Sequence, residues 1–227
     1  MASITHLKED PAARIRKGIE SGRFMPNEHL IESDLAEWLG TNRANVRLAL
    51  GRLEQEGLVV SEPNKGARVR LVSQAEAIEI IQVRSVLEGL VAREAAKHAT
   101  AADKKRLKDI VGRMRTTVSA GDLLAYSDIN GEFHSEIRAM SGHKTAERVL
   151  RMLNSQLVRF QYRVILIPGR PQQSLAEHKA IFDAINDGDG NAAESAMRKH
   201  LLGVQTALVE TMARDEDEAP RQKKLRA

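Results

Sequence analysis

The fold is decided by the stretch Leu39-Gly40-Thr41-Asn42-Arg43-Ala44-Asn45-Val46-Arg47-Leu48-Ala49-Leu50. Gly40 is the residue type at which a helix often ends, and the side chain of Thr41 or Asn42 can cap the helix that follows. We expect that second helix to run to about Glu56, because apolar residues recur in it at helical spacing. Two helices joined by a short polar turn indicate a helix-turn-helix.

The flanking residues complete a small domain over the first 72 residues. A proline that can open a helix lies upstream, and two short runs of strand-forming residues surround a turn rich in Pro, Asn and Gly downstream. The expected elements are helices over about 11–21, 32–39 and 43–56 and strands at 58–60 and 67–71. Three helices followed by a hairpin outline a winged helix-turn-helix.

The pattern changes at Ser73, where capping-box spacing opens a new helix. From there to about Met212 the sequence is helical in pattern, with breaks near 100, 121–122, 141–142, 168–171 and 187–190. These breaks leave about six helices, including a long one over about Lys144–Ile167. Short connections favour antiparallel neighbours. The predicted fold class is therefore mainly α: a winged helix-turn-helix over 1–72, an all-helical antiparallel bundle over 73–213 and a disordered, highly charged tail over 214–227.

Composition excludes several classes of protein. The chain has 227 residues, no cysteine and a formal charge of +4. Without cysteine there is no disulfide scaffold, no cysteine nucleophile and no Cys-ligated metal site. No apolar run approaches the roughly 18 residues that span a bilayer, and the first ten residues do not resemble a signal peptide. We therefore expect a cytoplasmic protein.

The placement of positive charge is more informative than its total. Residues 1–72 carry 11 basic and 10 acidic side chains, yet 43–53 carry three arginines and no acid. Arg43 and Arg47 are one helical turn apart at the N-terminal end of the second helix of the helix-turn-helix. In such motifs this end reaches the base edges in the major groove. Arginine suits bidentate contact with guanine or phosphate. Further positive charge, from Lys65 among others, falls on the predicted wing. The alternative is a solvated arginine face.

The same residues resemble the GntR family of bacterial transcription regulators. The matching stretch runs from Leu30 through the helix-turn-helix and the Leu53–Val59 segment to the wing glycine, Gly66, and Val69. Asn42 and Asn45 depart from the Ser or Thr and the Pro that are usual in the family, which affects the operator sequence. The resemblance implies that Arg43, Asn45 and Arg47 contact DNA and that the wing touches the minor groove. The predicted DNA-binding residues are Arg43, Asn45, Arg47, Thr41, Asn42, Lys65 and Gly66.

Four positions in the helical part have the spacing of metal ligands. Asn130 and His134 are four apart, so they lie about 40° apart on one helix face. His178 and His200 flank the 187–190 turn, on two helices expected to be antiparallel neighbours. Three imidazoles and an oxygen donor suit Zn, Ni, Fe or Mn. Each histidine taken singly is equally compatible with a capping, hydrogen-bonded or surface role.

The downstream region is similar to the FadR-like branch of this family, in its ligand-binding FCD domain. The matching segments are Val83–Glu88, Asn130–His134, Glu177–Ile181, Ala184–Asp189 and Arg198–Leu201. Many relatives bind a divalent metal through an Asp and three His at these positions, and here Asn130 occupies the Asp position. An amide oxygen brings no negative charge, so we expect weaker metal binding and a greater dependence on an anionic effector.

Three arginines are candidate partners for an effector carboxylate: Arg84, Arg159 and Arg163. The alternative for Arg84 is a salt bridge with Glu88, one helical turn away. Relatives commonly recognise small organic or sugar acids, which makes such an acid the expected effector.

The leading hypothesis is a homodimeric DNA-binding regulator, more specifically a repressor, whose affinity for a near-palindromic operator changes when the effector binds. One alternative is a regulator for which the metal ion itself is the signal. A His-site metalloenzyme is the other, but the sequence offers no evident general base beside the four ligands and no Gly-rich phosphate loop.

Overall fold

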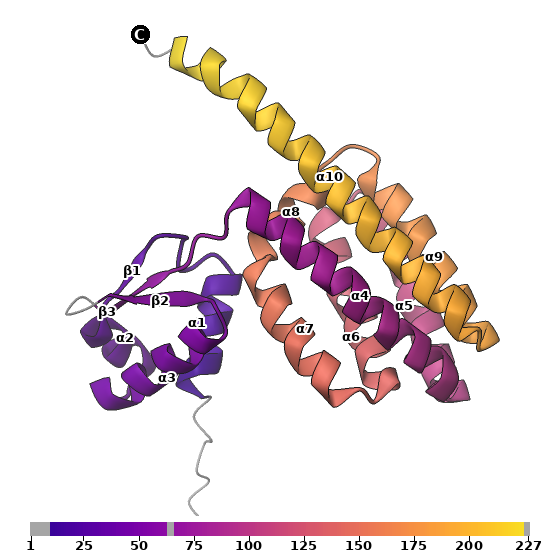
Figure 1. Ribbon diagram of the computed structural model, residues 1–227, viewed down its shortest axis with the longest axis horizontal. Coiled ribbons are helices and arrows are strands. Elements are labelled where there is room, and N and C mark those ends of the chain that lie inside the picture. Colours follow the sequence, from indigo (N-terminus) through magenta and orange to yellow (C-terminus); the bar gives the residue numbers. More distant parts are fainter. Residues whose placement is uncertain (1–9, 63–65, 225–227) are drawn as a thin grey trace, which may run out of the picture. The chain divides into compact units, whose positions relative to one another are not determined.

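The computed structural model describes residues 10–62 and 66–224, which form ten helices and three strands (Figure 1). Within these ranges the side chains of residues 158, 159, 161, 162 and 212–224 are not described. The chain divides into two compact units. The first contains Met1–Val72 together with Asn154–Val158, and the second contains Ser73–Leu153 and Arg159–Ala227. Helices dominate, as expected for the mainly α class.

Three helices build the first unit: α1 (Pro11–Glu20), α2 (Glu32–Leu39) and α3 (Arg43–Gln55). Pro11 lies in the first turn of α1, where a missing amide proton costs nothing. Helix α2 ends at Gly40, whose φ of 62° is left-handed. The side chain of Asn42 then caps α3 by accepting a hydrogen bond from the backbone amide of Asn45. Of the two predicted caps, Asn42 is the one used.

An antiparallel sheet completes this unit, with strands β1 (His29–Leu30), β2 (Val59–Glu62) and β3 (Gly66–Val69) in the order β1-β3-β2. Strands β2 and β3 form the predicted hairpin, in which Glu62 lies opposite Gly66. Strand β1 was not expected, because two residues are too few to show an alternating pattern. Its Leu30 is buried in a core that also contains Ile15, Leu35, Val46, Leu53, Val59 and Val69.

The remaining helices are α4 (Gln74–His98), α5 (Ala101–Ala120), α6 (Leu123–Ser141), α7 (Lys144–Gln156), α8 (Val158–Ile165), α9 (Arg170–Asp187) and α10 (Gly190–Lys224). Local sequence explains most of their ends. The Ser73 side chain caps α4, and Thr100 and Asp103 form a capping box on α5. Left-handed glycines follow α5, α6 and α9. The predicted breaks are therefore confirmed. No helix in the described ranges is long and apolar enough to cross a membrane.

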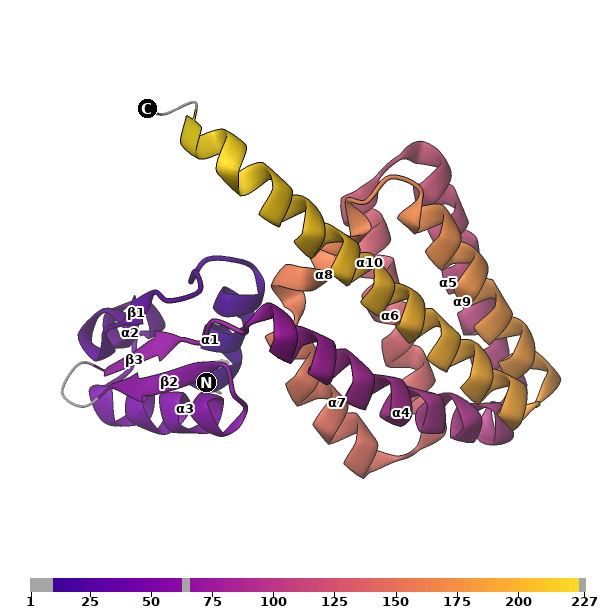
Figure 2. The same cartoon turned by 45° about the horizontal axis from the view of Figure 1, so that its top comes forward.

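Helices α4 and α10 of the second unit run side by side, and α9 lies beside α5 and α10 (Figure 2). Helices α6 and α9 each pack against both α4 and α5. Apolar side chains fill the interior between them, among them Phe133, Ile137, Ile181, Ile185 and Leu201. This packing gives α6, α9 and α10 a shared interior into which polar side chains can also converge.

The prediction of one long helix over about Lys144–Ile167 is wrong, because two helices, α7 and α8, occupy this segment. A bend at Leu157 separates α7 from α8, and the Leu157 amide donates to the carbonyl of Asn154 three residues earlier. The bend buries Leu157, which is 1% exposed. Polar residues of modest helix propensity, Asn154 and Ser155, precede it, so little local preference opposes the interruption.

The segment after residue 213 also differs from the expected disordered tail. Helix α10 continues to Lys224, so residues 214–224 are helical, and 225–227 lie outside the described residues. Most residues in this segment are Ala, Glu, Gln, Lys or Arg, which have good helix propensity. Pro220 is the exception, because a proline inside a helix removes one backbone hydrogen bond.

Candidate functional site

Three buried histidines meet inside the second unit. His134 comes from α6, His178 from α9 and His200 from α10, and they are 8%, 0% and 3% exposed. Their ring centroids are 4.4 to 5.4 Å apart. One nitrogen from each ring lies within 4.8 Å of the others, which is a spacing that a single ion can bridge. The structure thus brings together the three histidines that the spacing had singled out.

Each ring has an oxygen atom near its Nδ1. In His200, Nδ1 lies 2.7 Å from Oε2 of Glu177, and in His178, Nδ1 lies 3.5 Å from the hydroxyl of Tyr126. His134 Nδ1 lies 2.8 Å from Oε2 of Glu88, at ion-pair distance but without hydrogen-bond alignment. A neutral ring that donates from Nδ1 keeps its Nε2 lone pair for a metal.

Burial keeps two of these rings neutral. It lowers the pKa of His178 well below the usual value and lowers that of His200 to about 4, with further lowering from the neighbouring histidines. At neutral pH both rings are therefore unprotonated, which is the form that ligates metal ions. The Nε2 atom of His178 is buried and has no hydrogen-bond partner among the described residues. A buried ring nitrogen without a partner in a histidine cluster fits a bound divalent cation.

Two ionised carboxylates flank the cluster. Burial alone would raise the pKa of Glu88, but Arg84 and His134 outweigh it and hold the pKa well below its usual range. Glu177 behaves likewise, because hydrogen bonds from His200 and Arg170 overcome its burial and lower its pKa. The two carboxylates place negative charge on the Nδ1 side of the rings of His134 and His200, which favours a cation at their Nε2 atoms.

The predicted oxygen ligand, Asn130, lies one turn before His134 on α6 and is half-buried. Within the described residues, no hydrogen bond or ion pair joins it to the three rings, so its role stays a prediction. The structure therefore contains three nitrogen donors of the four-residue set. The donor chemistry fits a divalent transition metal such as Zn, Ni, Fe or Mn.

The candidate effector arginines differ in their surroundings. Arg84 is buried and donates from Nε and Nη2 to Oε1 of Glu88, at 3.0 and 2.7 Å. This is the salt bridge that the sequence offered as the alternative role. Arg163 is half-buried, and the side chain of Arg159 lies outside the described residues. The effector roles of these three arginines stay predictions.

Sequence reasoning missed several polar residues around the cluster. Glu177 forms an ion pair at 2.9 Å with the buried Arg170, and Tyr126 is 1% exposed beside His178. Arg138, one helical turn after His134 on α6, has a buried Nη1 without a hydrogen-bond partner in the described ranges. The adjacency of Glu177 to His178 was a usable signal, but the other contacts depend on tertiary packing.

Five of the seven predicted DNA-binding residues lie at the start of α3 or in the turn before it. Arg43, Asn45 and Arg47 are exposed. The Asn45 side chain donates to the hydroxyl of Thr41 at 2.9 Å, so the turn and the helix start hold each other in place. Gly66 begins β3, with a left-handed φ of 86°. Lys65 lies outside the described residues.

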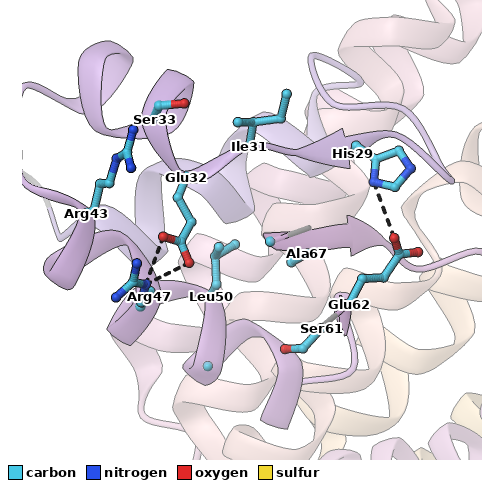
Figure 3. A pocket seen from close by; sticks show the side chains of 12 residues that line it. His29, Ile31, Glu32, Ser33, Arg43, Arg47, Leu50, Ser61, Glu62 and Ala67 are labelled. Atoms are coloured by element: carbon cyan, nitrogen blue, oxygen red, sulfur yellow. Dashed lines mark hydrogen bonds and ion pairs between the residues drawn. The ribbon is translucent and has the colours of Figure 1, made fainter. Parts of the chain in front are cut away.

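A groove of about 890 Å³ separates α3 from the β2–β3 hairpin (Figure 3). Arg43 and Arg47 line it on the helix side, and Glu62 and Gly66 line it on the hairpin side. Glu32, at the start of α2, points its carboxylate toward Arg47. A groove with arginines on the end of an exposed helix is suited to the edge of a DNA duplex.

Comparison with known proteins agrees with both halves of this description. Residues 7–69 match the bacterial regulatory proteins of the gntR family, and residues 79–203 match the FCD domain. The chain belongs to the GntR family. Its GntR domain followed by an FCD domain is the FadR-like architecture, and the proteins of this family are DNA-binding transcription regulators rather than enzymes. The metalloenzyme alternative is therefore set aside.

Individual relatives of this GntR-family chain are distant. The transcriptional repressor RspR of Escherichia coli is 25% identical over 86% of this chain and 85% of its own length. A putative L-lactate dehydrogenase operon regulatory protein of the same organism is 29% identical over 94% and 89%. Among solved structures, E. coli McbR/YncC has a TM-score of 0.75, 19% identity and coverage of 93% and 100%, which supports the fold.

Proposed function

We propose that this GntR-family regulator is a homodimeric repressor whose operator affinity is set by a small organic or sugar acid bound at a divalent-metal site in the FCD domain. The observation that carries the proposal is the buried cluster of His134, His178 and His200 in one unit, while the exposed Arg43 and Arg47 lie in the other. The names of relatives support this direction, since RspR is a repressor and another relative is assigned to an L-lactate dehydrogenase operon.

The DNA arm of the proposal uses Thr41, Asn42, Arg43, Asn45 and Arg47 on α3 and its turn, with Lys65 and Gly66 on the wing. Arg43 and Arg47 are exposed on one face of the helix. In a two-fold dimer, two such helices would enter successive major grooves of a near-palindromic site.

The metal arm uses the three histidines and Asn130. A divalent ion held there would attract a carboxylate oxygen of the effector. Nearby cationic groups, with Arg84 the first candidate, would neutralise the remaining negative charge. Because Asn130 is uncharged, the bound ion would keep more of its positive charge for the effector than it would beside an aspartate.

The DNA arm is tested with a duplex that the full-length chain selects from a random-sequence library. Arg43→Ala and Arg47→Ala should each weaken binding to that duplex about tenfold or more, since each removes a charged contact. Arg52→Ala is the matched control, because it removes the same charge from the exposed C-terminal end of α3. Unchanged affinity in both test variants, or no selected consensus, would contradict the proposal.

The effector arm is tested by elemental analysis of the purified chain and a thermal-shift screen of small carboxylic acids. A carboxylate that raises the melting temperature and also shifts the DNA-binding isotherm would identify the effector class. If His178→Ala removes both responses while DNA binding persists, the cluster is the sensor. A carboxylate response that is intact in the metal-free chain would argue against the metal site.

A second candidate is a regulator in which the ion itself is the signal. The observation that favours it is the engagement of Arg84 with Glu88, which occupies the first candidate for an effector cation. This version predicts that a chelator alone switches DNA binding and that Zn, Ni, Fe or Mn alone restores it. The effector version predicts that chelation changes DNA binding little unless the carboxylate is present.

A further inference from the structure

Glu32 is an acidic residue in the groove between α3 and the hairpin, which we assign to DNA binding, and it contacts one of the arginines of that groove. It is the first residue of α2, and its two carboxylate oxygens each lie 2.8 Å from Nε of Arg47 on α3 (Figure 3). The Glu32 side chain is 23% exposed and that of Arg47 is 65% exposed. The acid is therefore largely covered, while the arginine that it contacts still faces solvent.

The contact leaves the useful part of the arginine available. A guanidinium has five N–H donors, and Glu32 engages only the one on Nε. Among the residues whose side chains the structure describes, the terminal amino groups of Arg47 have no hydrogen-bond partner. A side chain anchored at Nε loses less conformational entropy when its outer edge binds, so the contact preorganises Arg47 for a planar, two-bond partner.

The same carboxylate is unfavourable for binding that depends on phosphate charge alone. Glu32 and Arg47 together carry no net charge, so their pairing weakens the attraction of Arg47 for any DNA backbone. A guanine edge offers two acceptors in the geometry that a fixed guanidinium matches. The pairing therefore disfavours non-specific DNA and favours a base in register with Arg47.

The helix dipole explains why an acid is favourable at position 32, but it does not explain why the carboxylate points toward Arg47. Carboxylates in the first turn of a helix interact favourably with the helix dipole, and Asp34 in the same turn has that interaction too. Asp34 accepts a hydrogen bond from Ser33 and is not paired with Arg47. Asp34 thus provides a matched control for the helix-dipole effect.

We propose that Glu32 is a specificity-determining positioning residue of the DNA-binding surface, which aligns Arg47 for a guanine in the major groove. The inference rests on the proposed assignment of Arg47 to the DNA interface. It adds an acidic residue to the predicted DNA-binding set, which the sequence analysis had built without any acidic residue.

The test compares Glu32→Gln and Asp34→Asn in the full-length chain, on the selected duplex and on a shuffled duplex of the same length and composition. For Glu32→Gln we expect about tenfold weaker binding to the selected duplex. Binding to the shuffled duplex should be unchanged or tighter. Asp34→Asn should leave the ratio of the two affinities unchanged. An unchanged ratio in Glu32→Gln, or an equal loss in Asp34→Asn, would overturn the inference.

Coupling to Arg47 separates positioning from a general structural effect. On an Arg47→Ala background, Glu32→Gln should cause no further loss of specificity, whereas on an Arg43→Ala background its full effect should remain. Glu32→Asp retains the carboxylate and should recover part of the ratio. Equal effects on both backgrounds would contradict positioning through Arg47. Thermal unfolding of each variant identifies any loss that arises from misfolding.

The outcomes also separate the inference from the proposed function. If Arg47→Ala binds the selected duplex as tightly as the unaltered chain, the assignment of Arg47 to the interface is wrong. If Arg47→Ala loses specific binding and Glu32→Gln does not, the assignment holds and only the role of Glu32 is wrong.

Discussion

Oε2 of Glu177 lies 2.7 Å from Nδ1 of His200, and Glu177 is the residue immediately before His178. One position on α9 therefore orients a ring on α10, while the next position contributes a ring of its own. Arg170 in the first turn of α9 donates to the same carboxylate from Nη1 and Nη2. The pair is closely packed, since a Cβ atom at Gly203 would come within 2.8 Å of Glu177 Oε1. Glu177 thus links the two helices, α9 and α10, that carry His178 and His200.

We expect Glu177→Gln to weaken the binding of a divalent metal by about 10- to 100-fold, as outer carboxylates that orient a ligating histidine commonly do. The amide loses the charge that holds the Nδ1 proton of His200. Competition with a metal-sensitive chelator dye measures the affinity. Asp183→Asn also replaces a carboxylate by an amide, at a half-exposed position of α9, and should have no effect. Equal affinities in Glu177→Gln and the unaltered chain would show that the carboxylate does not support the ligand.

We expect His178→Ala to abolish stoichiometric metal, because it removes the most deeply buried of the three rings and leaves two nitrogen donors. Elemental analysis after dialysis measures the metal content per chain. His98→Ala alters an exposed histidine of α4 and is the control, which should keep the metal of the unaltered chain. Metal that persists at full stoichiometry in His178→Ala would mean that the ion binds elsewhere.

The elements that sequence reasoning located are those that depend on local patterns. Helix ends at Gly40, Thr100 and Gly121 follow from capping and left-handed preferences of single residues. The meeting of His178 and His200 follows from one turn between two antiparallel helices. The helix ends depend on a few neighbouring residues. The approach of the two histidines depends only on their similar distances from the turn that joins their helices.

The contacts that it missed join residues far apart in the chain. Glu32 and Arg47 belong to different helices, and Tyr126 and His178 are 52 positions apart. Which oxygen faces which nitrogen depends on the rotation of each helix about its axis, and packing rather than local pattern decides that rotation. No glycine or proline near Leu157 predicts the bend there, which instead accompanies the burial of that leucine.

Arg84→Met should destabilise the fold, because it leaves the buried Glu88 with His134 as its ion-pair partner. Breaking a buried pair by removing one member costs about 3–5 kcal/mol in the free energy of unfolding. Glu88→Gln on the Arg84→Met background removes the stranded charge and should recover much of that loss. Urea unfolding measures both. A cost below about 1 kcal/mol for Arg84→Met would mean that the pair contributes little and would favour the effector role.

Gly66→Ala should damage the wing. Gly66 has a φ of 86°, where a side chain costs roughly 1–2 kcal/mol. Its new Cβ would also lie 2.7 Å from the carbonyl oxygen of Leu30, which is backbone and has little freedom to move. We expect a lower melting temperature and weaker binding to the selected duplex, because β1 must shift away from β3.

Gly51→Ala provides the comparison for Gly66→Ala. Gly51 lies inside α3, and a Cβ there meets no atom within 4 Å. Replacing a glycine in a helix interior by alanine stabilises it by roughly 0.5–1 kcal/mol, so this variant should melt at a higher temperature than the unaltered chain. The two changes add the same methyl group and should move the melting temperature in opposite directions. Shifts of the same sign would contradict the conformational strain assigned to Gly66, since side-chain size alone would then explain both.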